Sequence, residues 1–324
     1  MPRSLAAVGS ALLLILAFPR FSLWPCAWVA LGPIFYQIRR STNLRASFFY
    51  FYLLGVLFFL VTWEWLRHVT YFGWFFLAFG YAFYFGLFGF FVFWFWSRKQ
   101  YFLSLFALPS AWAVLEWIRT EIPVWGFGWN LLAYSQASHL PLAGIAGFIG
   151  AYGLSWLIMF VNLAFLFLLE FLLRHRKEDG FSTLFSFLFL GIVLSLYFGF
   201  YEKRGQVLKP VPVFSAQVET IRIASVQGNI PQEGKWDPKN KDAIINVYEG
   251  LSRFVPAEGK PDLIVWPEAA FPGYFNLDSE RVRILRLVKE LEVPILLGSP
   301  HLENKIPYNS AYLVDHESPV VERY

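Results

Sequence analysis

The sequence predicts a polytopic α-helical membrane domain followed by an α/β domain. Hydrophobic residues make up 57% of the 324-residue chain and charged residues only 15%, whereas a soluble domain carries about 25% charged residues. The long apolar runs lie almost entirely within residues 1–201. Residues 221–324 instead alternate short apolar segments with amphipathic ones, which is typical of an α/β domain. We therefore expect a membrane domain at 1–201, a connector at 202–220 and an α/β domain at 221–324.

Seven segments of the first domain are candidate membrane helices. A helix that crosses a bilayer needs about 20 apolar residues, and somewhat fewer when polar residues at its ends reach the interface. The candidates lie at residues 4–18, 23–38, 47–66, 71–96, 101–119, 143–173 and 181–201. The first is short, but it lacks the small-residue cleavage site of a signal peptide, so we interpret it as a retained helix.

The basic residues predict the orientation of these helices. If the N-terminus is cytoplasmic, the inside loops carry nine Lys and Arg residues and the short outside loops carry three, with Lys203 and Arg204 as an exception. Positive charge concentrates in cytoplasmic loops. Seven crossings then place residues 202–324 on the far side, which in a bacterium is the periplasm.

Charge and cysteine content exclude several classes of function. The net charge of +4 does not indicate nucleic-acid binding, because the basic residues of the first domain are scattered between apolar segments, where they set topology. Cys26 is the single cysteine, so an intrachain disulfide and a cysteine-based metal cluster are both excluded. We expect no metal site, and we expect Cys26 to be a small buried apolar residue.

The second domain alternates strands with helices. Strands are expected at 221–227, 263–266, 293–297, 311–314 and 320–323, and helices at 237–254 and 279–291. The β-α-β-α-β order of its first five elements favours a sheet whose faces are covered.

Glu268 is the candidate catalytic residue of this domain. It lies in PDLIVWPEAAFPGYF, residues 261–275, just past a strand that reads as buried, and α/β folds place their sites at this end of their strands. The apolar residues around it offer little solvation, which suits a general base. The alternative is a glutamate that caps a turn or pairs with a lysine. The loop at 225–238, which contains Trp236, either walls a pocket beside Glu268 or is an ordinary connection.

Several motifs together resemble the apolipoprotein N-acyltransferase family. VQGNIPQEGKWDP, DLIVWPEAAFP and PYNSAYLVD follow one another after a polytopic region. Upstream lie FPRFSLWP at 18–25, ALPSAWAVLEWIR at 107–119 and AYSQASHLPLAGIAGFIGAYGLSWL at 133–157. The resemblance covers essentially the whole chain, and the three-part signature of the second domain is more specific than any of its pieces.

The resemblance implies a multi-pass protein of the bacterial inner membrane with a nitrilase-like αββα sandwich in the periplasm. Such enzymes use a Glu-Lys-Cys triad, in which Glu268 would be the general base. The thiolate would take an acyl chain from a phospholipid such as phosphatidylethanolamine and pass it to the diacylglyceryl-cysteine N-terminus of an apolipoprotein. The expected partners are these two substrates and the bilayer, and no cofactor is implied.

The family's lysine and cysteine have no counterpart in this chain. The lysine follows shortly after the strand that VVERY represents, and the cysteine and a final membrane helix lie further on, whereas the sequence stops at Tyr324. A fragment, a truncated gene product and half of a split enzyme all fit, with an incomplete α/β domain. The alternative function is a catalytically silent membrane protein that binds lipid or lipoprotein.

Other side chains are candidates for substrate binding. Glu116 and Arg119 lie three residues apart on one face of a helix and would pair there; they would position a phospholipid head group or, alternatively, snorkel to the interface. Tyr134 and Gln136 would border a lipid entrance. Asn309 would form hydrogen bonds near the pocket as a supporting residue.

Overall fold

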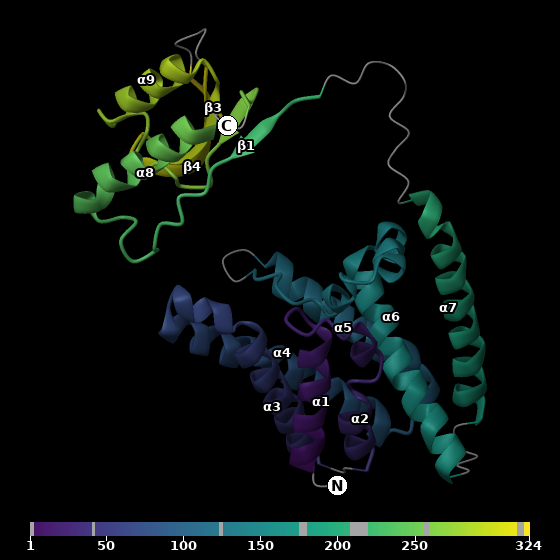
Figure 1. The fold of residues 1–324 in the computed structure, drawn as a ribbon. Coiled ribbons are helices and arrows are strands. Elements are labelled where there is room, and N and C mark those ends of the chain that lie inside the picture. Colours follow the sequence, from purple (N-terminus) through teal and green to yellow (C-terminus); the bar gives the residue numbers. More distant parts are fainter. Residues whose placement is uncertain are drawn as a thin grey trace. The chain divides into compact units, whose positions relative to one another are not determined.

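The computed structural model describes residues 3–40, 43–122, 126–174, 180–207, 220–255, 259–315 and 321–324. The chain divides into two compact units, residues 1–211 and 212–324, each of which is described by itself (Figure 1). The last helix of the first unit runs to Val207, past the end expected at 201. Residues 208–219 of the expected connector lie outside the described residues.

The first unit is helical. Its helices are α1 Arg3–Ala17, α2 Gly32–Ile38, α3 Leu44–Thr62, α4 Tyr71–Ser97, α5 Tyr101–Glu121, α6 Leu140–Arg174 and α7 Gly180–Val207, and its 3-10 turns are η1 Trp24–Trp28, η2 Glu64–His68 and η3 Leu132–Gln136. Among the described residues, four helices are long and apolar enough to cross a membrane: Leu44–Thr62, Tyr71–Ser97, Tyr101–Glu121 and Ala143–Leu172. Arg3–Ala17 and Gly180–Ser195 are shorter apolar helices.

The helix expected at 23–38 was wrong. This segment forms η1, a turn and the seven-residue α2. Pro25 and Pro33 explain the interruption, because proline has no N–H for an intrahelical hydrogen bond and is tolerated only in the first turn of a helix. Both prolines lie at such starts, Pro25 in η1 and Pro33 in α2.

The interrupted segment is partly buried, and side chains of other helices bind its free backbone groups. Asn162 of α6 accepts a hydrogen bond from the Leu31 N–H at 2.8 Å and donates one to the Ala27 carbonyl at 2.8 Å. Ser10 of α1 accepts one from the Ile34 N–H at 3.2 Å. Irregular backbone inside an apolar unit needs such partners, because no water is available there.

The segment also runs alongside α6 from one end of the unit to the other. The Trp24 ring stacks on His139, just before α6, with 4.2 Å between centroids. Arg39 pairs with Glu170 near the other end of α6, with 2.6 Å between Nη1 and Oε2. This segment therefore contacts residues near both ends of α6.

The second unit contains one mixed five-stranded sheet. Its strands are β1 Ile223–Ser225, β2 Leu263–Val265, β3 Ile295–Glu303, β4 Ile306–Val314 and β5 Val321–Arg323, in spatial order β1-β2-β3-β4-β5. The first three are parallel, and β3-β4 and β4-β5 are antiparallel. The helices are α8 Lys241–Phe254, which follows the 3-10 turn η5 Pro238–Asn240, and α9 Arg281–Leu291. The expected strands and helices thus occur in the expected order.

The β3-β4 hairpin is longer than the sequence suggested. Each strand has nine residues, against the five and four expected at 293–297 and 311–314. Asn304 and Lys305, between the paired residues Glu303 and Ile306, both have positive φ, 51° and 65°. Two left-handed residues form the tight turn that matches the twist of a hairpin.

We predict that Asn162→Leu destabilises the first unit. The Leu31 N–H and the Ala27 carbonyl would both lose a buried partner, at a cost of about 1–3 kcal/mol for each group. The free energy of unfolding, measured in detergent micelles, should fall accordingly. Ser195→Ala is the matched control, because it removes one exposed side-chain bond to the Gly191 carbonyl and should cost less than about 0.5 kcal/mol. Equal stability of the two variants would contradict this account.

Candidate functional site

The end of β2 is fixed to α8 by Trp266. The indole ring is buried, donates a hydrogen bond from Nε1 to Ser252 Oγ at 2.9 Å, and stacks on Tyr248 with 4.9 Å between centroids. Burial raises the pKa of the Tyr248 hydroxyl, so this ring stays neutral at physiological pH. Glu268 lies two positions after Trp266. The main chain that leads to Glu268 is therefore held against α8.

The turn that carries Glu268 requires a glycine on the neighbouring strand. A Cβ at Gly298 of β3 would lie 2.7 Å from Glu268 Cα and 2.8 Å from the Ala269 nitrogen, closer than atoms approach without displacement. Ala269 itself has φ of 50°, a conformation that few residues other than glycine adopt. The Phe271 N–H donates to the Gly298 carbonyl at 3.2 Å. The backbone of residues 268–271 is thereby held against β3.

The Glu268 carboxylate is bound by Asn309 of β4. Asn309 Nδ2 donates to Glu268 Oε1 at 2.6 Å, whereas the sequence suggested only that Asn309 forms hydrogen bonds within the sheet near the pocket. Sequence reasoning missed Lys235, whose Nζ donates to the Glu268 main-chain oxygen at 3.3 Å. The loop at 225–238 therefore does reach the end of β2, through Lys235.

The environment expected around Glu268 was wrong in one respect. Trp266, Ala270 and Phe271 are buried, but Glu268 lies exposed on the surface of the second unit. The tight turn directs the apolar side chains into the core and the carboxylate away from it. Trp236 is also exposed, at 51%, and it does not wall an enclosed pocket within the described residues.

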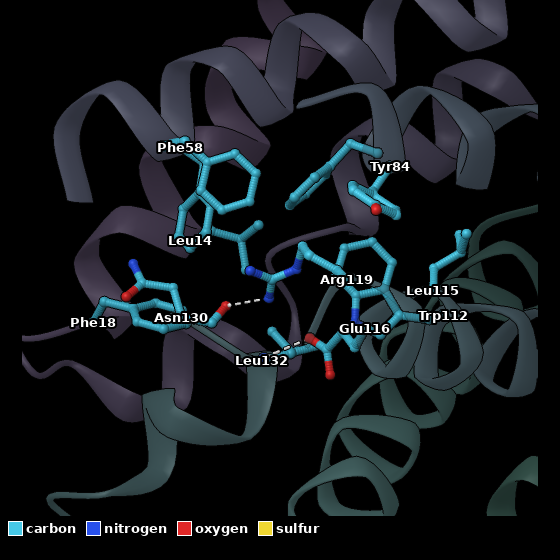
Figure 2. A pocket seen from close by; sticks show the side chains of 12 residues that line it. Leu14, Phe18, Phe58, Tyr84, Trp112, Leu115, Glu116, Arg119, Asn130 and Leu132 are labelled. Atoms are coloured by element: carbon cyan, nitrogen blue, oxygen red, sulfur yellow. Dashed lines mark hydrogen bonds between the residues drawn. The ribbon is translucent and has the colours of Figure 1, made fainter. Parts of the chain in front are cut away.

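The first unit holds a second group of candidate residues, Glu116 and Arg119 of α5 (Figure 2). Each is only 4% exposed, so neither snorkels to an interface. The pairing expected between them was also wrong, because each binds the backbone that follows α5. Arg119 Nη1 donates to the Phe127 carbonyl at 3.0 Å and the Trp129 carbonyl at 2.8 Å. Glu116 Oε1 accepts from the Leu132 N–H at 2.7 Å.

Glu116 and Arg119 line a narrow cavity. Its other walls include Leu14, Phe58 and Trp112, and its volume is about 20 Å³, which is room for about one water molecule. Glu116 Oε2 has no hydrogen-bond partner in the part of the chain that the structure describes, so a water there would complete its bonding. A phospholipid head group does not fit this cavity as it stands, and the two side chains instead fix the segment from Phe127 to Leu132.

Gln136 extends this network and Tyr134 does not. Gln136 is fully buried, accepts a hydrogen bond from Trp28 Nε1 at 3.0 Å and donates one to the Trp24 carbonyl at 3.3 Å. It therefore joins η3 to η1 and does not border an opening. Tyr134 is 45% exposed and remains available at the surface.

The described residues contain no group of three or more His, Cys, Asp or Glu side chains able to hold a metal ion. Cys26 is half-buried in η1 and packs against the core of the first unit, as a small apolar residue would.

We predict that Arg119→Leu loosens the segment from residue 126 to 136. The variant removes the guanidinium that donates to the carbonyls of Phe127, Trp129 and Asn130. Amide hydrogen exchange in this segment should therefore become at least about tenfold faster. Arg98→Leu is the control, because Arg98 is exposed and donates only to the Trp94 carbonyl within the described residues. Unchanged protection at 126–136 would mean that Arg119 does not hold this segment.

Known proteins are similar to this chain in sequence. Residues 10–164 match the family described as the apolipoprotein N-acyltransferase N-terminal domain. An apolipoprotein N-acyltransferase of Geobacter metallireducens is 32% identical over 98% of this chain and 62% of its own length. One of Chlorobaculum tepidum is 27% identical over 90% of this chain and 54% of its own length. One of Nitrosomonas europaea is 34% identical over 55% of this chain and 32% of its own length.

These matches cover both units but only part of each relative. The chain spans about 62% of the length of the Geobacter protein. The similarity includes the segments that hold Glu116, Arg119 and Gln136, which fall within the matched residues 10–164. The resemblance that the sequence motifs indicated is thus confirmed: the chain is similar to proteins named apolipoprotein N-acyltransferase over nearly its whole length.

Proposed function

We propose that this protein serves the N-acylation of apolipoproteins, in which a phospholipid acyl chain is transferred to a diacylglyceryl-cysteine N-terminus. The observation that carries the proposal is the Glu268 carboxylate at the end of β2, held at Oε1 by Asn309 at 2.6 Å. It lies in a chain whose similarity to proteins named apolipoprotein N-acyltransferase extends over 98% of its length. Phosphatidylethanolamine is the donor that we propose.

Glu268 is suited to act as the general base. Asn309 donates to one carboxylate oxygen, and this leaves Oε2 to accept a proton from an attacking thiol. The thiolate would attack the acyl ester and release the lysophospholipid, which takes up the proton from Glu268. The lipoprotein amine would then attack the resulting thioester and form the amide as the carbon–sulfur bond breaks. Glu268 would take the proton of the amine and return it to the departing thiolate, which restores the thiol and the base. A lysine would stabilise the oxyanion in both steps.

Neither the thiol nor that lysine is assigned to a residue of this chain. Cys26 belongs to the first unit and lies half-buried in η1. Lys235 contacts the main chain of Glu268 and not its carboxylate. The proposal therefore concerns the complete enzyme, to which this chain would contribute the base and its supporting asparagine in a nitrilase-like domain.

We further propose that the first unit lies in the bacterial inner membrane with its N-terminus in the cytoplasm and residues 202–324 in the periplasm. Contacts between loops support the division of the loops into two groups, on which this orientation rests. Arg20, Glu64 and Trp129 belong to one end of the unit, where Arg20 pairs with Glu64 and the Trp65 ring contacts Trp129 in a tilted arrangement. Arg39 belongs to the other end with Glu170 and Tyr101. These are the two groups that the charge asymmetry assigns to opposite sides.

We predict that acyl transfer depends on Glu268. The assay uses residues 1–324 fused to the segment of the Geobacter relative that lies beyond the aligned region, in vesicles with a labelled phospholipid and a diacylglyceryl peptide. Glu268→Gln keeps the shape but removes the base, and should lower lysophospholipid release by roughly 10²–10⁴-fold. Asn309→Ala should lower it less, by up to about 10²-fold, because the base is misplaced and not lost.

Asn276→Ala is the matched control for Asn309→Ala. Asn276 donates to the Leu302 carbonyl at 2.8 Å in the same unit and has no contact with Glu268, so its variant should retain activity. Transfer within about threefold of the parent for Glu268→Gln would contradict the general-base role. A fusion that binds the diacylglyceryl peptide without turnover would favour the alternative of a catalytically silent binding protein.

The proposed topology predicts a labelling pattern. In the Cys26→Ser background, cysteine would replace either the exposed Lys99, between α4 and α5, or the exposed Glu233, in the second unit. A membrane-impermeant maleimide should label position 233 when only the outer membrane is opened, and position 99 only after the inner membrane is lysed. Labelling of both positions in the same compartment would exclude the seven-crossing arrangement.

A further inference from the structure

The connection between α1 and η1 has an unusual backbone. Arg20 and Ser22, neither of them glycine, have φ of 87° and 54°. Non-glycine residues are uncommon in this region, and such outliers concentrate at functional sites. The effect here is to direct the Arg20 side chain toward η2, where Nη2 donates to Glu64 Oε2 at 2.5 Å.

Two arginines share one carboxylate at this place. Arg67 Nε lies 2.5 Å from Glu64 Oε1, and Arg20 occupies the other oxygen. The hydrogen bond from Arg20 is the main cause that lowers the pKa of Glu64, so the carboxylate is ionised and the cluster carries one net positive charge. The Arg20 and Arg67 side chains remain 65% and 43% exposed, against 19% for Glu64. Both guanidinium groups therefore keep donors that face outward.

An apolar groove begins at this cluster. It runs between the end of α1 and the end of α3, and its volume is about 160 Å³. The lining residues are Ile15, Pro19, Arg20, Phe21, Val61, Thr62 and Trp65. Arg20 is the single charged side chain among them, so the groove combines an apolar wall with a cationic end.

The surroundings of the groove are those of a membrane interface. Phe21 and Trp65 are 51% and 38% exposed, and the Trp65 ring lies tilted against Trp129 with 5.1 Å between centroids. Exposed aromatic rings beside arginines are typical of the level of the lipid head groups. In a bilayer, the groove would therefore face the level at which the acyl chains of a phospholipid join its phosphate group.

We propose that this groove is a binding site for one anionic phospholipid. The phosphodiester would accept hydrogen bonds from Arg20 and Arg67, whose planar groups suit phosphate, and the upper part of one acyl chain would lie against Ile15 and Val61. The net positive charge of the cluster favours an anionic head group over a zwitterionic one. The lipid is a resident lipid of the first unit, and its binding does not depend on acyl transfer.

The test measures lipid retention by native mass spectrometry. The 324-residue chain in detergent is mixed with equal amounts of dioleoyl-phosphatidylglycerol and dioleoyl-phosphatidylcholine. The parent should retain phosphatidylglycerol about two- to fivefold better. The double variant Arg20→Gln, Arg67→Gln should lose about tenfold or more of that retention, since each charge-assisted hydrogen bond contributes roughly that factor. Arg98→Gln, which removes an exposed arginine at the other end of α4, should behave as the parent.

A second variant protects the test against misfolding. Val61 is 42% exposed, so Val61→Trp should fill the groove without disturbing the core, and it should lower retention while the melting temperature without lipid stays unchanged. Equal retention of the two lipids by the parent, or undiminished retention by both the double variant and Val61→Trp, would overturn the proposal. Displacement of the lipid by excess inorganic phosphate would also overturn it, because the site would then bind free phosphate.

Discussion

The need to satisfy backbone groups without water determines the architecture of the helical unit. Two stretches of its described residues contain irregular backbone that polar side chains of other elements support, the one from Trp24 to Ile38 and the one from Phe127 to Gln136. Each is held by polar side chains that reach in from long helices, namely Asn162 for the first and Arg119 with Glu116 for the second. An unsatisfied amide in such a setting costs several kcal/mol. The buried polar residues of this unit are therefore the means by which irregular backbone is tolerated among apolar helices.

In the α/β unit, irregular backbone is also supported by contacts from other elements, but there it positions a carboxylate at the surface. Here the irregular backbone lies at the surface, in the turn after β2, and its support comes from Gly298 and the buried Trp266. The turn exposes Glu268, and Asn309 from β4 fixes the carboxylate. Because the hydrogen bond joins a turn to a strand 41 positions later in the sequence, the β3-β4 hairpin has to form before the carboxylate is positioned. The long hairpin is thus part of the candidate site.

Periodicity and motifs predicted a helical part followed by an α/β part and the order of its strands, because each of these follows from local pattern or from residues that recur in known motifs. What the sequence could not predict depends on contacts between distant segments. Apolar composition suggested a helix at 23–38, and only the prolines and the distant Asn162 explain why it breaks. Spacing suggested a Glu116–Arg119 pair, but the backbone of the following segment competes for both groups. An apolar neighbourhood in sequence suggested a buried Glu268, whereas the tight turn separates it from its neighbours.

The partner of each carboxylate decides what that carboxylate is able to do. Glu170 is buried against Arg39 and serves the fold. Glu64 lies between two exposed arginines, which neutralise it and retain a positive charge that suits a phosphate. Glu268 accepts a hydrogen bond from a neutral amide, which orients one carboxylate oxygen but carries no positive charge. An arginine at that position would stabilise the ionised form and so weaken the base. An asparagine orients one carboxylate oxygen and leaves the other open to a proton donor, which is the arrangement that a general base requires.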